Sequence, residues 1–121
     1  MKILSILTMP VTAGSAPMTQ EEMDPGSAQQ ESMRAFVEEM RSNGVLIDTG
    51  GRAPNMLELI VARKNGKSTI TDGPFTEAKE VVGGFALMEV KDRDDAIAQT
   101  NRFLDLIGTG TCHLHEVGDS P

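Results

Sequence analysis

Residues 85–91 read Phe-Ala-Leu-Met-Glu-Val-Lys, and this stretch decides the fold class. Its apolar residues occupy both alternating sets of positions, which predicts a central strand covered on both faces. Before it, residues 56–63 and 67–71 predict two more strands, and Asn65-Gly66 between them is a strong signal for a two-residue hairpin turn. The core of the domain is therefore expected to be a sheet.

Two amphipathic helices are expected outside these strands. The first covers residues 27–43 and ends before Gly44. Its apolar stripe falls at helical spacing and consists of Met33, Phe36, Val37 and Met40. Asp92 is expected to cap the second helix, and Gly108 is expected to end it. The buried side of this second helix is predicted to consist of Ile97, Phe103, Leu104 and Ile107.

The order of the expected elements is strand, helix, strand, hairpin, strand, helix, strand. The first strand is the apolar run before Pro10, and the last covers residues 111–117. This is the split βαββαβ pattern with an additional hairpin. We predict one α+β domain over residues 1–118 with a polar tail at 119–121. Both helices would cover one face of an antiparallel sheet and leave the other face open.

The charge and composition exclude several classes of partner. The formal net charge is -7, so nucleic-acid backbones and anionic membranes would be repelled. The chain has no Trp and no Tyr, which argues against a base-stacking platform. No run reaches the roughly 18 apolar residues of a membrane span. Because Pro10 ends the short apolar run at the N-terminus, we interpret it as a buried strand and not a secretory signal, and we expect a cytoplasmic protein.

One polar segment, residues 71–84, carries a motif that resembles a known family. Asp72-Gly73-Pro74-Phe75 is followed by Glu77, by Lys79-Glu80 and by Gly83-Gly84 before an apolar strand. These residues resemble the DGPF-type branch of the YCII-related (YciI-like) family of small bacterial proteins. The resemblance extends weakly over most of the chain.

The resemblance implies a ferredoxin-like fold that pairs sheet to sheet into a dimeric α+β barrel, with a cleft on the helix-free face. The family is largely uncharacterised, and a His-Asp pair has been proposed as catalytic in its YciI-like branch. That histidine lies in the first helix, whereas the histidines of this chain are His113 and His115, both in the last expected strand. We therefore do not expect this His-Asp pair in the present chain. An uncovered apolar sheet face independently favours a homodimer.

The motif has a chemical and a structural interpretation. In the chemical one, Asp72 is presented on a rigid turn, and Glu77 and Glu80 share a helical face and act as acid and base. Lys79 would hold an anionic substrate, and Phe75 would wall an apolar pocket. In the structural one, Asp72 caps a turn, Phe75 fills the core and the charged residues are solvated.

The second candidate is His113-Leu114-His115. On a strand the two imidazoles share a face, while Cys112 and Leu114 take the other. They could act as a general base or as metal ligands, but two ligands are too few for a tetrahedral site, and no metal is predicted. The alternative is two ordinary polar residues on a half-exposed strand. Asp48 and Arg52 flank a Gly-Gly turn and either reach the same cleft or belong to a solvated loop.

These residues leave two function classes open. One is an enzyme that performs isomerase- or lyase-type proton transfer on a small organic molecule, with no cofactor, because no cofactor motif is present. The other is a non-catalytic ligand-binding or regulatory module, linked to sigma-factor-type transcriptional signalling through a protein partner. A pocket with clustered carboxylates would favour catalysis, whereas an apolar pocket without titratable groups would favour binding.

Overall fold

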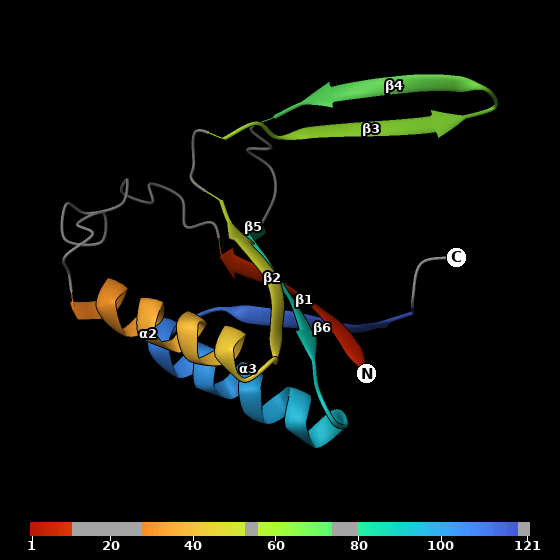
Figure 1. Ribbon diagram of the computed structural model, residues 1–121. Coiled ribbons are helices and arrows are strands. Elements are labelled where there is room, and N and C mark those ends of the chain that lie inside the picture. The colour runs from red at the N-terminus through yellow and green to blue at the C-terminus, as the bar shows by residue number, and fades with distance from the viewer. Residues whose placement is uncertain (11–27, 53–55, 74–79, 119–121) are drawn as a thin grey trace.

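A four-stranded antiparallel sheet covered by two helices forms the body of the computed structural model (Figure 1). The structure describes residues 1–10, 28–52, 56–73 and 80–118. The strands of the sheet lie in the order β2-β5-β1-β6. Their bounds are Lys2–Pro10 for β1, Leu46–Gly51 for β2, Glu80–Glu89 for β5 and Thr111–Val117 for β6.

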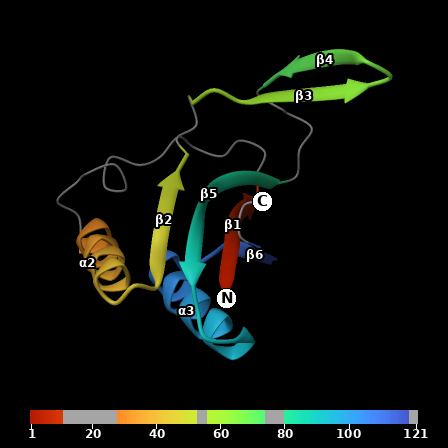
Figure 2. The ribbon, with the colours of Figure 1, turned by 45° about the vertical axis from the view of Figure 1, so that its right-hand side comes forward.

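Both helices, α2 (Ala28–Ser42) and α3 (Arg93–Ile107), lie on the same face of the sheet (Figure 2). Each crosses over between two strands, so the body has the βαββαβ order and the strand arrangement of a ferredoxin-like fold. Asp92 caps α3 as predicted, because its side chain accepts a hydrogen bond from the Asp95 N–H at 2.8 Å. The α+β prediction with one open sheet face is confirmed. No described helix is long and apolar enough to cross a membrane.

The additional hairpin is present as a separate two-stranded sheet, β3 (Leu59–Lys64) and β4 (Lys67–Asp72). Asn65 and Gly66 both have positive φ, 52° and 77°, as the turn between such strands requires. Figures 1 and 2 show the hairpin standing away from the helices and the four-stranded sheet. Every residue of both strands is exposed. The hairpin is therefore an arm, and the body has its core without it.

The core lies between the sheet and the helices, toward the beginning of β1. Ile3, Met88, Val90 and Ala96 form a buried cluster. Leu114 packs against this cluster from β6, which places it on the helix-covered face of the sheet. The fully buried apolar set is small, so the core fills only part of the space between the two layers.

Three details of the elements differ from the sequence-based expectation. Gly50 and Gly51, expected as a turn between Asp48 and Arg52, lie inside β2, so this strand is longer than predicted. Strand β5 begins at Glu80, so Gly83 and Gly84 lie inside a strand and not in a loop before it. In α3, Ile97 is 39% exposed, whereas Ala96 is buried. The helix is therefore rotated so that Ala96 and Thr100, and not Ile97, accompany Phe103 and Ile107 toward the sheet.

Candidate functional site

An apolar cavity of about 330 Å³ lies between the two helices and the sheet. Small-molecule sites in proteins have volumes of about 300–1,000 Å³, so this cavity has the size of a ligand site. Leu7 and Met88 line it from the sheet, and Phe103 and Ile107 line it from α3. No described residue of its lining is an acid, a base, a histidine or a cysteine.

The apolar stripe of α2 forms one wall of the cavity. Met33, Phe36, Val37 and Met40 all line it, which matches the stripe expected from their spacing. Met40 is 2% exposed, whereas the first three are only half-buried. The helix therefore packs firmly near its C-terminal end and stands further from the sheet along the rest of its length. That separation creates the cavity.

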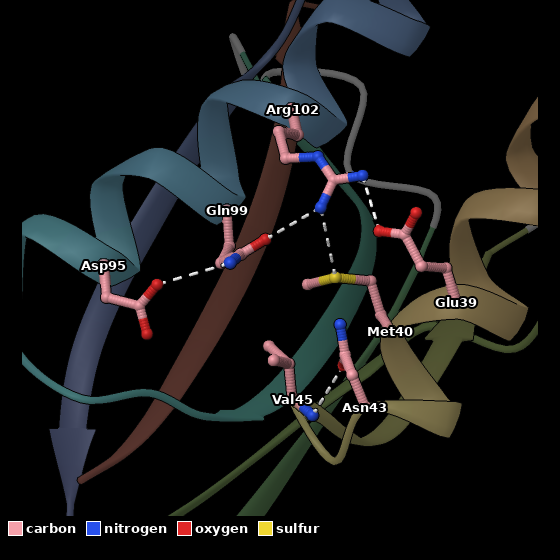
Figure 3. A network of polar contacts seen from close by, with 7 residues as sticks. All are labelled: Glu39, Met40, Asn43, Val45, Asp95, Gln99 and Arg102. Atoms are coloured by element: carbon pink, nitrogen blue, oxygen red, sulfur yellow. Dashed lines mark hydrogen bonds and ion pairs between the residues drawn. The ribbon is translucent and has the colours of Figure 1, made fainter.

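Arg102 of α3 ties α2 to the body at the edge of this wall (Figure 3). Its guanidinium group donates to the Glu39 carboxylate at 2.6 Å and lies 5.1 Å from the centre of the Phe36 ring. It also donates to the Met40 sulfur at 3.9 Å and to Gln99 Oε1 at 3.4 Å. Since Phe36 and Met40 are cavity residues, Arg102 holds the helix wall in place from outside.

Glycines form the opposite end of the cavity, where β2 and β5 come close together. A Cβ on Gly84 would lie 2.6 Å from the Gly50 carbonyl oxygen, which is closer than atoms can approach. A Cβ on Gly50 would lie 2.8 Å from the Phe85 ring. The Gly83-Gly84 pair noted in the sequence therefore has a packing role in the structure.

The predicted histidines lie on the other face of the sheet. His113 and His115 are both exposed, and they pair with Ile6 and Leu4 of β1. A hydrogen bond of 3.3 Å joins the Thr8 hydroxyl to His113 Nε2. Cys112 points to the helix side and is half-buried, and this burial raises the pKa of its thiol.

Asp48 and Arg52 make local contacts. Asp48 accepts a hydrogen bond from the Thr49 N–H at 2.9 Å. Arg52 forms an ion pair of 3.8 Å with Glu58 and donates to the Val82 carbonyl at 3.4 Å. Arg52 therefore fastens the base of the hairpin arm to β5.

The motif residues are only partly described. Asp72 ends β4 and Glu80 begins β5, and both are exposed. Phe75, Glu77 and Lys79 lie outside the described residues. Their predicted roles as pocket wall, acid or base, and anion anchor stay predictions.

The predicted polar site and the cavity involve different residues. None of Asp48, Arg52, Asp72, Glu80, His113 and His115 lines the cavity. No hydrogen bond or ion pair within the described part of the chain joins two of them. The same part holds no cluster of three or more His, Cys, Asp or Glu side chains that could bind a metal. The helical spacing of the apolar residues in α2 predicted the stripe that forms one wall of the cavity. The cavity itself depends on the distance between the helix and the sheet, which no sequence pattern encodes.

Comparison with known proteins agrees with the resemblance in the sequence. The family model of the YCII-related domain matches residues 11–103, which is more than half of the chain. No curated protein matches the chain.

Proposed function

Because the chain belongs to the YCII-related family, we propose that it binds a small, largely apolar organic molecule between its helices and its sheet. The observation that carries this proposal is the cavity of about 330 Å³ whose described lining is uncharged. Such a lining favours apolar ligands, since their surface is removed from water without any loss of charge solvation. A bound ligand would also fill space that the small core leaves empty.

The same lining favours binding over catalysis at this place. General acid–base chemistry needs titratable groups within hydrogen-bond reach of the substrate, and the described wall offers none. Isomerase- or lyase-type chemistry would need Asp72, Glu77, Glu80, His113 or His115, in a cleft on the open face completed by a second copy. We keep that enzyme as the alternative, together with a regulatory module in sigma-factor-type signalling. A Glu80→Gln and His113→Gln double variant that keeps the measured turnover of the wild type would oppose the catalytic alternative.

The binding proposal is tested by filling the cavity. Val37→Phe would place a ring in the cavity from α2, whereas Ala35→Phe would place the same ring on the exposed side of that helix. The probe is the neutral dye N-phenyl-1-naphthylamine, whose fluorescence rises in apolar surroundings. We expect the wild-type protein and Ala35→Phe to bind it alike and Val37→Phe to lose at least tenfold in affinity. Equal affinity of all three, with unchanged circular dichroism, would contradict the proposal.

We also propose that the open face of the sheet pairs with a second copy of the chain. This proposal is supported by apolar side chains of that face, including Leu4, Ile6 and Leu87, and by Val82, which is 43% exposed. Exposed apolar patches of this kind usually mark interfaces. The pairing would form the dimeric α+β barrel expected from the family.

The dimer is tested by a pair of matched charge substitutions. Val82→Glu places a carboxylate on the open face, and Ile97→Glu places one at a similarly exposed position of α3. Light scattering at micromolar concentration should give a dimer mass for the wild type and Ile97→Glu, and a lower mass for Val82→Glu. A monomer mass for the wild type would contradict the pairing.

Two finer assignments rest on the sequence. The Asp72-Gly73-Pro74-Phe75 motif supports placement in the DGPF-type branch of the family. A single cysteine, Cys112, fits a reducing cytoplasm. Export of the protein to the periplasm in a fractionated cell would contradict the second assignment.

A further inference from the structure

One hydroxyl in the cavity wall lacks a hydrogen-bond partner. Thr100 lies on the sheet-facing stripe of α3, between Ala96 and Phe103, and lines the cavity. Its Oγ1 is buried, and it makes no hydrogen bond to any of the described residues. Buried polar groups in native proteins are nearly always paired, so an unpaired hydroxyl in a cavity calls for an explanation.

The other polar side chains of the wall already have partners. The Ser5 hydroxyl hydrogen-bonds the Cys112 thiol, and the Thr49 hydroxyl donates to the Phe85 carbonyl at 2.8 Å. Gln99 donates to Asp95 at 3.3 Å and accepts from Arg102 at 3.4 Å. Among the polar side chains of the described wall, Thr100 is thus the one left to hydrogen-bond a ligand.

The charges around the cavity favour a neutral ligand. A charged molecule would lose its hydration in this wall without gaining a counter-charge, and that loss is large. The charged groups of Arg102 and Glu39, at the edge of the α2 wall, form an ion pair with each other at 2.6 Å. Neither residue lines the cavity.

The apolar part of the wall favours an aromatic ligand. Phe36 and Phe103 supply two rings, and Met33, Met40 and Met88 supply three thioethers. Aromatic rings pair favourably with other rings and with methionine sulfur, beyond the gain from burial alone. Methionine side chains also adapt to the outline of the bound molecule.

We infer that the ligand is a neutral aromatic molecule with one hydroxyl or carbonyl group, and that this group hydrogen-bonds the Thr100 hydroxyl in the cavity. The inference rests on the proposed function, because it names the class of molecule that the same cavity takes. Thr100 selects the oxygenated molecule from its plain hydrocarbon counterpart, and the uncharged wall excludes the carboxylate. Selection of this kind arises because an unmade hydrogen bond leaves the hydroxyl unpaired.

Three probes of one ring system test the inference: naphthalene, 2-naphthol and 2-naphthoate. The chain contains no Trp and no Tyr, so the fluorescence of the naphthalene ring is measured without interference from the protein. We expect wild-type protein at pH 7 to bind 2-naphthol about threefold to tenfold more tightly than naphthalene, as one hydrogen bond predicts. We expect 2-naphthoate to bind at least tenfold more weakly than 2-naphthol.

The variant Thr100→Val keeps the shape of the side chain and removes the hydroxyl. It should bind naphthalene at least as well as the wild type and lose the preference for 2-naphthol. Thr8→Val is the matched control, because Thr8 lies on the open face beside His113, and it should keep the wild-type preference.

The possible failures are distinguishable. If the wild type binds neither naphthalene nor 2-naphthol, the proposed binding function is wrong. If both bind with equal affinity, if Thr100→Val keeps the preference, or if 2-naphthoate binds best, the cavity binds ligands but the inference about Thr100 and neutral ligands is wrong.

Discussion

The face of the sheet that α2 and α3 cover differs in chemistry from the face that they leave open. The covered face holds a cavity with an uncharged described lining, whereas the open face carries His113, His115 and Asp48. Residue types alone suggest chemistry on the open face. The shape of the molecule instead provides a hollow of ligand size on the covered face. The comparison shows that reactive side chains and a place for a ligand need not coincide within one chain.

The largest effect should come from the glycine end of the covered face. Gly84→Ala would bring a methyl group to 2.6 Å from the Gly50 carbonyl oxygen and force β2 and β5 apart. We expect a loss of about 3 kcal/mol in the free energy of unfolding, as for severe overpacking. Gly51→Ala is the control: its methyl group would meet its nearest atom at 3.9 Å and should cost no more than about 0.5 kcal/mol. If urea denaturation shows equal losses of unfolding free energy for Gly84→Ala and Gly51→Ala, the close approach of β2 and β5 at Gly84 is contradicted.

A smaller effect is expected where α2 is tied to α3. Arg102→Leu removes the ion pair with Glu39 and the contact with the Phe36 ring, both half-exposed. The expected loss is about 1 kcal/mol, because solvent weakens such contacts. Arg93→Leu removes the ion pair with Asp94, whose side chains are 84% and 91% exposed, and should change stability by less than about 0.5 kcal/mol. If the two variants have the same urea midpoint, Arg102 does not hold the cavity wall.

The two faces can be compared directly through two threonines. Thr100→Val removes an unpaired buried hydroxyl from the covered face and should stabilise the ligand-free protein by about 1 kcal/mol. Thr8→Val removes an exposed hydroxyl bonded to His113 on the open face and should destabilise it by about 0.5 kcal/mol. Thermal melting of both variants shows whether each substitution raises or lowers the stability. A loss of stability in Thr100→Val would mean that its hydroxyl has a partner.

The smallest effect concerns acid stability at the start of α3. The Lys91 backbone N–H and the Gln99 amide donate to the Asp95 carboxylate and hold its pKa below the usual value. Because the pKa is lower in the folded state, this carboxylate stabilises the fold above the unfolded-state pKa of about 4. The contribution disappears as the pH falls through the folded-state pKa. Asp95→Asn should therefore be less stable than the wild type at pH 7, and the difference should shrink at pH 3. If the stability difference between the wild type and Asp95→Asn instead grows at pH 3, the Asp95 carboxylate does not stabilise the fold in the way described.

The sequence predicted the body of the molecule well because its signals are local. Asp92 has the right side chain to cap α3, Asn65-Gly66 accepts the positive φ values of its turn, and the α2 stripe repeats at helical spacing. These features depend on neighbours in the chain, so they are visible without the fold.

The remaining features depend on contacts between distant segments. Gly83 and Gly84 were expected outside the strand, but β5 contains them. The backbone of β2 leaves no room for a side chain at Gly84, and the Leu7 and Met9 side chains of β1 crowd Gly83. Because of the rotation of α3, Thr100 lines the cavity and Ile97 is exposed. This rotation is determined by packing against the sheet and not by the sequence of the helix. Thr100 was not among the residues expected from the sequence, and the signal that could have found it is a hydroxyl on an otherwise apolar face of the helix.

Binding in the cavity is tested most directly by the methyl signals of the methionines. Met33, Met40 and Met88 line the cavity, whereas Met1 and Met56 are exposed elsewhere on the surface. In protein labelled with ¹³C at the methionine methyl groups, 2-naphthol should shift the signals of the first three in a saturable manner and leave those of Met1 and Met56 in place. Shifts confined to Met1 and Met56, or no saturable shift at all, would contradict a ligand site between the helices and the sheet.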